Sequence, residues 1–276
     1  MRAHAIGMAT LLAIVAPACG EKKAENEGPR AKKVSTTAAG STGSLTGRIA
    51  FDGAAPEMPE LPRYTETGKP KDAACDTHEK AEYVVVNGGG VKDVVVRLAV
   101  GAVARPAASE TPPPLVIDQK NCRYSPHVAV AITGQKIAFR NDDDTMHNVH
   151  TYRGTETDFN IAQPKGTPEQ VKDVTVPAGD VPYKIGCDVH PWMQAFVLVT
   201  DHPYVTVTGA DGTFKLDNLP YGSYKLEAWH PYLGQKTIDV TVEPGKAVEV
   251  KLPAFGPADA RVSPAALYAA MTSSEQ

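Results

Sequence analysis

The sequence predicts an all-β protein in which a Greek-key β-sandwich is flanked by further small β-sandwich segments. Gly and Pro are plentiful, at 23 residues each in a chain of 276, and frequent turns of this kind are typical of proteins built from short strands. Val-rich runs recur between the turns, and no long stretch places apolar residues at helical spacing. The length allows two or three small domains.

Residues 1–18 are expected to be a signal peptide that exports the chain. A basic start is followed by an apolar run at 5–16 that is too short to span a bilayer. The next residues, Ala-Pro-Ala-Cys, resemble a bacterial lipobox, in which Cys19 becomes the lipidated first residue of the mature protein and anchors it to the membrane. Because Ala16 stands where this pattern usually has Leu, cleavage after Ala18 without lipidation remains the alternative. The prediction is an exported protein, either periplasmic or an outer-membrane lipoprotein of a Gram-negative-type bacterium.

Residues 19–43 are rich in Lys, Glu, Ala, Ser, Thr and Gly and have almost no large apolar side chain. Such a segment cannot bury a core, so we expect a disordered tether. Residues 44–105 follow as an N-terminal β segment that begins with an alternating strand. Within it, Val-rich runs at 83–87 and 94–98 flank three glycines, a pattern that predicts a hairpin.

The central domain is expected at residues 106–200, after a Pro-rich linker. Seven runs with strand character follow one another at short spacing, which suggests a Greek-key sandwich. The expected strands lie at 115–118, 127–132, 135–141, 147–152, 171–176, 183–187 and 195–200. Residues 201–255 hold further strand-like runs separated by turn residues and predict a second β-sandwich, and residues 256–276 are expected to form a C-terminal tail.

The four cysteines separate into different tasks. Cys19 belongs to the export signal, and Cys187 lies in a loop rich in other metal-ligand residues. Cys75 and Cys122 remain, and disulfides persist in the compartments that exported proteins reach. We therefore expect a Cys75–Cys122 disulfide, worth roughly 4 kcal/mol in the chain-entropy model; two unpaired buried thiols are the alternative.

The run 187–193, Cys-Asp-Val-His-Pro-Trp-Met, places a thiolate, an imidazole and a thioether at intervals of three residues. About forty residues upstream, His147 and His150 supply further imidazoles in the run 141–150. Two His nitrogens and one Cys sulfur with a weak axial Met are the ligand set of a blue-copper electron-transfer site. On a strand, residues three apart face opposite sides, so only one of the two upstream histidines should reach the ion.

The run His-Asn-Val-His, followed later by Cys-x-x-His-Pro-x-Met, closely resembles the cupredoxin family, and the copper motifs are most similar to those of amicyanin. The resemblance covers roughly residues 115–200, and Trp192 stands where Phe is usual. It implies that Asn148 braces the copper loop by hydrogen bonding and that His150 is not a ligand. The ligands that it implies for one type 1 copper ion are His147, Cys187, His190 and Met193.

The flanking segments depart from a single-domain cupredoxin. The arrangement is similar to multidomain exported cupredoxin-like proteins, sometimes labelled methylamine-utilisation proteins. Residues 201–255 resemble the carboxypeptidase regulatory-like, or transthyretin-like, β-sandwich.

These patterns predict an electron carrier and not an enzyme, because no catalytic group is identified. Its partners would be redox proteins, a cytochrome or a dehydrogenase, that dock on an apolar patch formed by Pro191, Trp192 and Met193 over the edge of His190. The neighbouring acidic run 142–144 is expected to be a solvated turn. A net charge of −4 and a pI near 6.1 argue against nucleic acid as a partner.

Two other functions stay open at this point. One is a copper storage or delivery protein, which would share the ligands but release the ion readily. The other is a structural or carbohydrate-binding surface protein with a vestigial copper site.

Overall fold

The computed structural model describes residues 42–103, 112–173, 178–179 and 182–261, together with residues 263, 265, 266 and 269. The predicted signal peptide, Cys19, nearly all of the predicted tether and most of the predicted C-terminal tail lie outside these described residues. Within them, the all-β prediction is confirmed, because the main elements are β-strands; two short 3-10 helices and the helical residues 265, 266 and 269 are the exceptions. None of the helices in the described part is long and apolar enough to cross a membrane.

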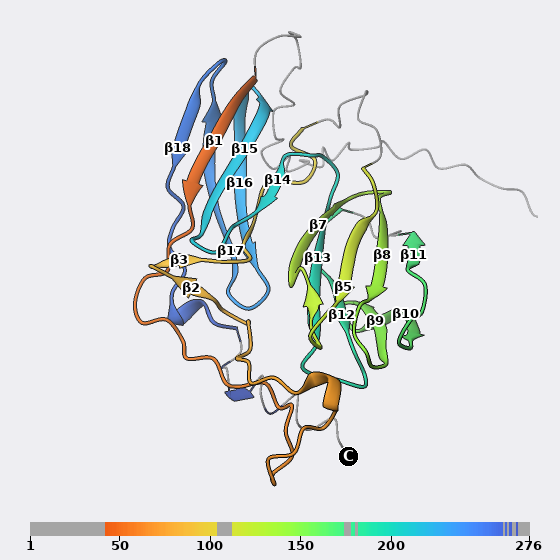
Figure 1. The fold of residues 1–276 in the computed structure, drawn as a ribbon. Helices are drawn as coiled ribbons and strands as arrows, with labels where there is room; N and C mark the ends of the chain where they lie inside the picture. The colour runs from red at the N-terminus through yellow and green to blue at the C-terminus, as the bar shows by residue number, and fades with distance from the viewer. Residues whose placement is uncertain are drawn as a thin grey trace, which may run out of the picture. The chain divides into compact units, whose positions relative to one another are not determined.

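The central domain consists of two sheets that face each other (Figure 1). The first has the order β10-β9-β12-β13-β7 and the second the order β11-β8-β5-β6. Phe139 of the second sheet lies edge-on to Phe159 of the first, with ring centroids 5.7 Å apart. Gln119 and Gln163 also join the two sheets by a hydrogen bond of 2.6 Å. The strands are β5 (Leu115–Gln119), β6 (Tyr124–Ser125), β7 (Val128–Ile132), β8 (Lys136–Asn141), β9 (His147–Arg153), β10 (Glu156–Gln163), β11 (Gln170–Asp173), β12 (Tyr183–Gly186) and β13 (Gln194–Thr200).

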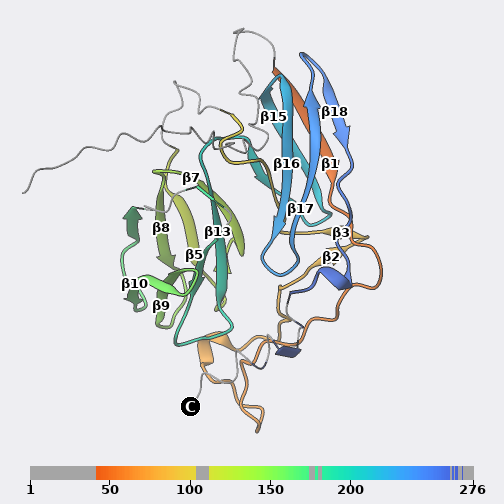
Figure 2. The ribbon, with the colours of Figure 1, turned by 180° about the vertical axis from the view of Figure 1, so that it is seen from behind.

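A second sandwich is assembled from both ends of the chain, and we call it the composite sandwich (Figure 2). One sheet has the order β15-β1-β18, and the other has the order β14-β4-β16-β17. Its strands are β1 (Thr42–Arg48), β4 (Val95–Leu98), β14 (Val205–Val207), β15 (Thr213–Pro220), β16 (Gly222–His230), β17 (Gly234–Val242) and β18 (Ala247–Val250).

The N-terminal β segment, residues 44–105, is therefore not a unit by itself. β1 pairs with β15 on one side and with β18 on the other, and β4 lies between β14 and β16. β1 and β4 are both interior strands of their sheets, so the region 201–255 needs them to satisfy its backbone hydrogen bonds.

The expected hairpin also has a different register. The strands that pair across the glycines are β2 (Val86–Asn87) and β3 (Gly90–Val91), joined by Gly88 and Gly89. Both glycines have positive φ, at 54° and 79°, as a tight two-residue hairpin turn requires. The Val-rich run that was expected to be the second hairpin strand belongs instead to β4, which is buried along its whole length.

Residues 59–82 form an irregular segment that lies over the loop 187–193, which holds three of the predicted metal ligands. We call it the cover segment. It doubles back on itself through the bridges Glu60–Lys80 and Tyr64–Pro70 and contains one turn of 3-10 helix, η1 (Ala73–Cys75). The Cys75–Cys122 disulfide is present, with a Cα–Cα distance of 5.6 Å, and it ties the segment to the turn between β5 and β6. The second 3-10 helix, η2 (Pro257–Asp259), lies near the end of the described chain.

Candidate metal centre

Three of the predicted ligands converge at one edge of the central domain. His147 is the first residue of β9, and Cys187 directly follows β12. These strands are antiparallel neighbours with Gly186 opposite His150, so the start of one lies beside the end of the other. His190 comes from the loop between β12 and β13. Its Nδ1 lies 2.9 Å from Nδ1 of His147 and 3.9 Å from Sγ of Cys187.

These spacings fit a single bound ion. Transition-metal bonds to imidazole nitrogen and thiolate sulfur are about 2.0 and 2.3 Å long, so donors on one ion lie at most about 4.3 Å apart. The distances of 2.9 Å and 3.9 Å from Nδ1 of His190 to the other two donors lie below this limit. All three residues are buried, at 0% exposure for His147, 4% for Cys187 and 3% for His190. The donor set of two imidazoles and one soft thiolate suits a transition metal of the copper type.

Met193 is buried, and its backbone closes the loop. Its N–H donates to the carbonyl of His190 at 2.8 Å, and its carbonyl accepts from the N–H of Cys187 at 3.3 Å. These bonds bring both ends of the ligand loop together between β12 and β13. The axial role of the Met193 sulfur stays a prediction.

Asp143 is part of the site, although the sequence analysis treated its acidic run as a solvated turn. That expectation is wrong for this residue, which is 8% exposed. Its carboxylate accepts hydrogen bonds from the N–H groups of Asn121 and Cys122, each at 2.7 Å, and from Nε2 of His147 at 2.9 Å. Burial alone would raise the pKa of Asp143, but the bonds from His147 and the two backbone groups outweigh it and lower the pKa. The side chain is therefore a carboxylate that orients His147.

The surroundings of Cys187 lower the pKa of its thiol. Burial alone would raise its pKa, but hydrogen bonds with His147 and His190 outweigh burial and lower the pKa to about 6. Burial likewise acts to lower the pKa of His147, yet Asp143 and Cys187 raise it to about 9. At neutral pH without metal, Cys187 is thus a thiolate, which is the form that binds metals. Among the described cysteines it is the one outside the disulfide.

Asn148 makes the hydrogen bonds to the loop that the sequence analysis expects of it. Its Oδ1 accepts from the N–H groups of Asp188, at 2.6 Å, and Val189, at 3.4 Å. His150 lies away from the three donors, with Nδ1 2.9 Å from Asp188 Oδ1 and its ring stacked on Tyr152. The strand places His147 and His150 on opposite sides, as their spacing requires.

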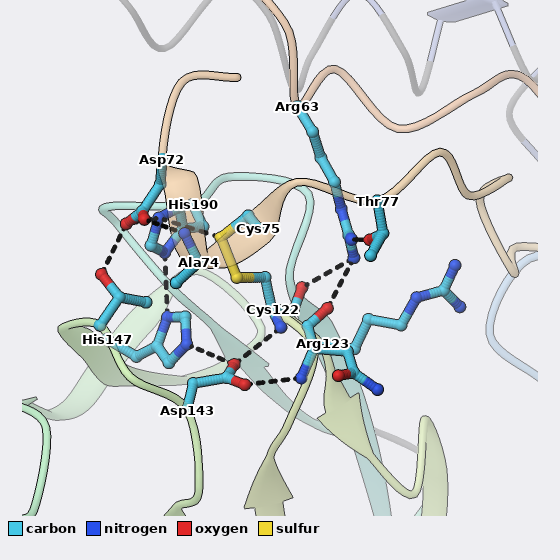
Figure 3. Close-up of a disulfide and its surroundings, with 12 residues drawn as sticks. Arg63, Asp72, Ala74, Cys75, Thr77, Cys122, Arg123, Asp143, His147 and His190 are labelled. Carbon is cyan, nitrogen blue, oxygen red and sulfur yellow. Dashed lines mark hydrogen bonds and ion pairs between the residues drawn. A yellow bond between two sulfur atoms is a disulfide. The ribbon is translucent and has the colours of Figure 1, made fainter.

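The cover segment encloses His190 (Figure 3). Nε2 of His190 lies 3.3 Å from Oδ2 of Asp72 and 3.7 Å from Sγ of Cys75. Trp192 is 6% exposed, and its indole N–H donates to the carbonyl of Cys122 at 3.1 Å. The expected docking patch at Pro191 and Trp192 is therefore not an exposed surface in this structure, because the cover segment and its disulfide occupy that side. Pro191 is half-buried.

Sequence reasoning missed Asp72 and Asp143. Asp143 sits between two other acidic residues, and nothing in the run Asp-Asp-Asp distinguishes it except its position four residues before His147. Asp72 had no detectable signal, because it is far from the ligands in the sequence and reaches them only through the fold.

One known family model matches part of the chain. A model of the carboxypeptidase regulatory-like domain matches residues 190–253, a minority of the chain. This supports the expectation of such a sandwich at 201–255, although the match begins at His190. No curated protein matches the chain.

Solved structures of copper proteins are similar to parts of the chain. A purple cupredoxin from Nitrosopumilus maritimus is 23% identical over 32% of this chain and 100% of its own, with a TM-score of 0.27. A copper-containing nitrite reductase from Thermus scotoductus SA-01 is 20% identical over 37% of this chain and 25% of its own, with a TM-score of 0.26. A reduced Cu(I) form of a mutant amicyanin is 23% identical over 37% of this chain and 98% of its own, with a TM-score of 0.27. TM-scores this low support no functional conclusion, which must come from the geometry of the site.

Proposed function

We propose that this protein is an exported carrier of single electrons that uses one type 1 copper ion. The observation that carries the proposal is the convergence of His147 Nδ1, His190 Nδ1 and Cys187 Sγ in a buried position. Met193 would complete the proposed ligand set with its thioether sulfur. Bound copper would supply a one-electron couple that imidazole, thiolate and thioether donors accommodate in both oxidation states.

The protein's own contribution is to hold the donors in one arrangement. Asp143 fixes the ring of His147, and Asn148 holds the backbone of the loop next to Cys187. Such outer contacts set the orientation and basicity of metal ligands. Because the donors are buried on all sides that the structure describes, the site favours electron exchange over binding a substrate. We therefore propose a carrier and not an enzyme.

The same burial supports a carrier over a storage or delivery protein. Release of the ion would require the cover segment to move, and the Cys75–Cys122 disulfide restrains it. A disulfide also fits an exported protein, since it persists in oxidising compartments. Lipidation at Cys19 and docking to a cytochrome or a dehydrogenase remain part of the proposal.

Copper loading followed by an absorption spectrum tests the proposed function. The copper(II) protein should show an intense visible band from thiolate-to-copper charge transfer and lose it on one-electron reduction. Replacing Cys187 by Ser should abolish the band and copper retention together. A protein that binds copper tightly without this band would contradict the electron-transfer proposal.

A further inference from the structure

We propose that Asp72, on the cover segment, is a positioning residue for His190 that sets the reduction potential of the copper site. This inference rests on the proposed function. Each of the two histidines turns Nδ1 toward the other and Nε2 toward a carboxylate. For His147 the carboxylate is Asp143, at 2.9 Å, and for His190 it is Asp72, at 3.3 Å (Figure 3).

The two carboxylates come from different parts of the chain. Asp143 precedes His147 by four residues and belongs to the central domain. Asp72 belongs to the cover segment and reaches His190 from the side opposite the other donors. The central domain thus supplies the ligands, whereas the support of His190 comes from outside it.

Asp72 is itself held in place by three restraints. Its Oδ1 accepts from the N–H of Ala74 at 2.8 Å, where it caps η1. Its Oδ2 accepts from the hydroxyl of Thr145 at 2.5 Å, and Thr145 lies in the same turn as Asp143. The disulfide of Cys75, three residues along the segment, anchors η1 above His190. Because Asp72 is restrained in this way, it can fix the orientation of the His190 ring.

The chemical consequence follows from the hydrogen bond to Nε2. A carboxylate that accepts the Nε2 proton fixes the imidazole tautomer in which Nδ1 is free to bind a metal, and it increases the basicity of that nitrogen. Its negative charge stabilises the higher oxidation state of a nearby ion more than the lower one. Two donors, the hydroxyl of Thr145 and the N–H of Ala74, hold the oxygens of this carboxylate in place beside Nε2 of His190.

The test compares reduction potentials of the copper-loaded full chain by spectroelectrochemical titration. Asp72→Asn keeps the size of the side chain and removes its charge. We expect it to shift the equilibrium about tenfold toward the reduced state, which corresponds to about 59 mV for a one-electron couple. Asp76→Asn is the matched control, since Asp76 is an exposed residue of the same segment that bonds to Tyr64. Its potential should equal that of the wild type.

A second readout does not depend on the potential. In the diamagnetic Cu(I) form, the Nε2 proton of His190 should give a slowly exchanging NMR signal that Asp72→Ala removes and Asp76→Asn preserves. Equal potentials for Asp72→Asn and Asp76→Asn, or an unchanged proton signal in Asp72→Ala, would overturn the role of Asp72 alone. A wild-type protein without the visible band would instead overturn the proposed function, and this inference with it.

Discussion

His147 in the central sandwich and His230 in the composite sandwich are both buried, at 0% and 1% exposure. Burial acts to lower the pKa of each, but His147 faces Asp143 and Cys187, which raise its pKa to about 9. Among the described residues, no carboxylate raises the pKa of His230; burial and the nearby His127 lower it to about 3. The difference comes from the acidic groups beside His147, which oppose the effect of burial and orient its ring.

Removing the disulfide should have a large effect both on stability and on the enclosure of His190. Replacing both Cys75 and Cys122 by Ser should cost about 4 kcal/mol in the free energy of unfolding of the metal-free protein, since the bond closes a long loop. It should also release the cover segment from His190. Denaturant titration measures the first effect, and the rate at which a chelator removes copper measures the second. A variant that loses copper at the wild-type rate would contradict the covering role of the segment.

Replacing Asp143 by Asn should remove part of the difference between His147 and His230. Cys187 would still oppose burial, but the contribution of Asp143 would be lost, so the pKa of His147 should fall. Copper affinity should drop by about 10- to 100-fold, as for other lost partners of ligand histidines. Competition with a chelator of known affinity measures the loss. Asp142→Asn is the control, because Asp142 is exposed and its side chain interacts with Arg140, across 3.9 Å, and with Asp118, both away from His147. Equal affinities for the two variants would show that the carboxylate does not support His147.

The predicted metal ligands could be found from the sequence, whereas the carboxylates that contact the ligand histidines could not. His147, Cys187 and His190 lie in two short motifs at the ends of strands whose alternation is readable, and the antiparallel pairing of β9 and β12 brings them together. Asp72 could not be found in this way, because its contact depends on a disulfide and on a segment without regular structure. A single sequence holds no local signal for such a contact.

In the composite sandwich, the strands could be predicted from the sequence but their pairing could not. β1 and β4 are recognisable as strands, but their pairing with β15, β18, β14 and β16 joins opposite ends of the chain. Strand propensity predicts that a segment is extended and does not identify its partner. The prediction of the hairpin register was wrong for the same reason. A Val-rich run next to three glycines fits a central strand as well as a hairpin strand.

Acid should destabilise the composite sandwich through His230. Its folded pKa of about 3 lies below the unfolded value, so the unfolded chain binds more protons as the pH falls. The contribution to stability is therefore complete above about pH 6.5 and is lost toward pH 3, at about 1.4 kcal/mol per pH unit. Unfolding free energies of the wild type and His230→Gln should show a shallower slope for the variant. Parallel slopes would mean that His230 is not the group that titrates.

The smallest effect is expected for His150, which is only partly buried and pairs with Asp188 beside the loop. Replacing His150 by Ala removes this pair and the stacking on Tyr152, so the free energy of unfolding should fall by about 0.5 kcal/mol, in the range of surface ion pairs. The visible band and copper affinity should stay close to those of the wild type. His147→Ala, by contrast, should abolish both, because it removes a donor and leaves Asp143 without its partner. If His150→Ala bleached the site and His147→Ala spared it, the assignment of the upstream ligand would be reversed.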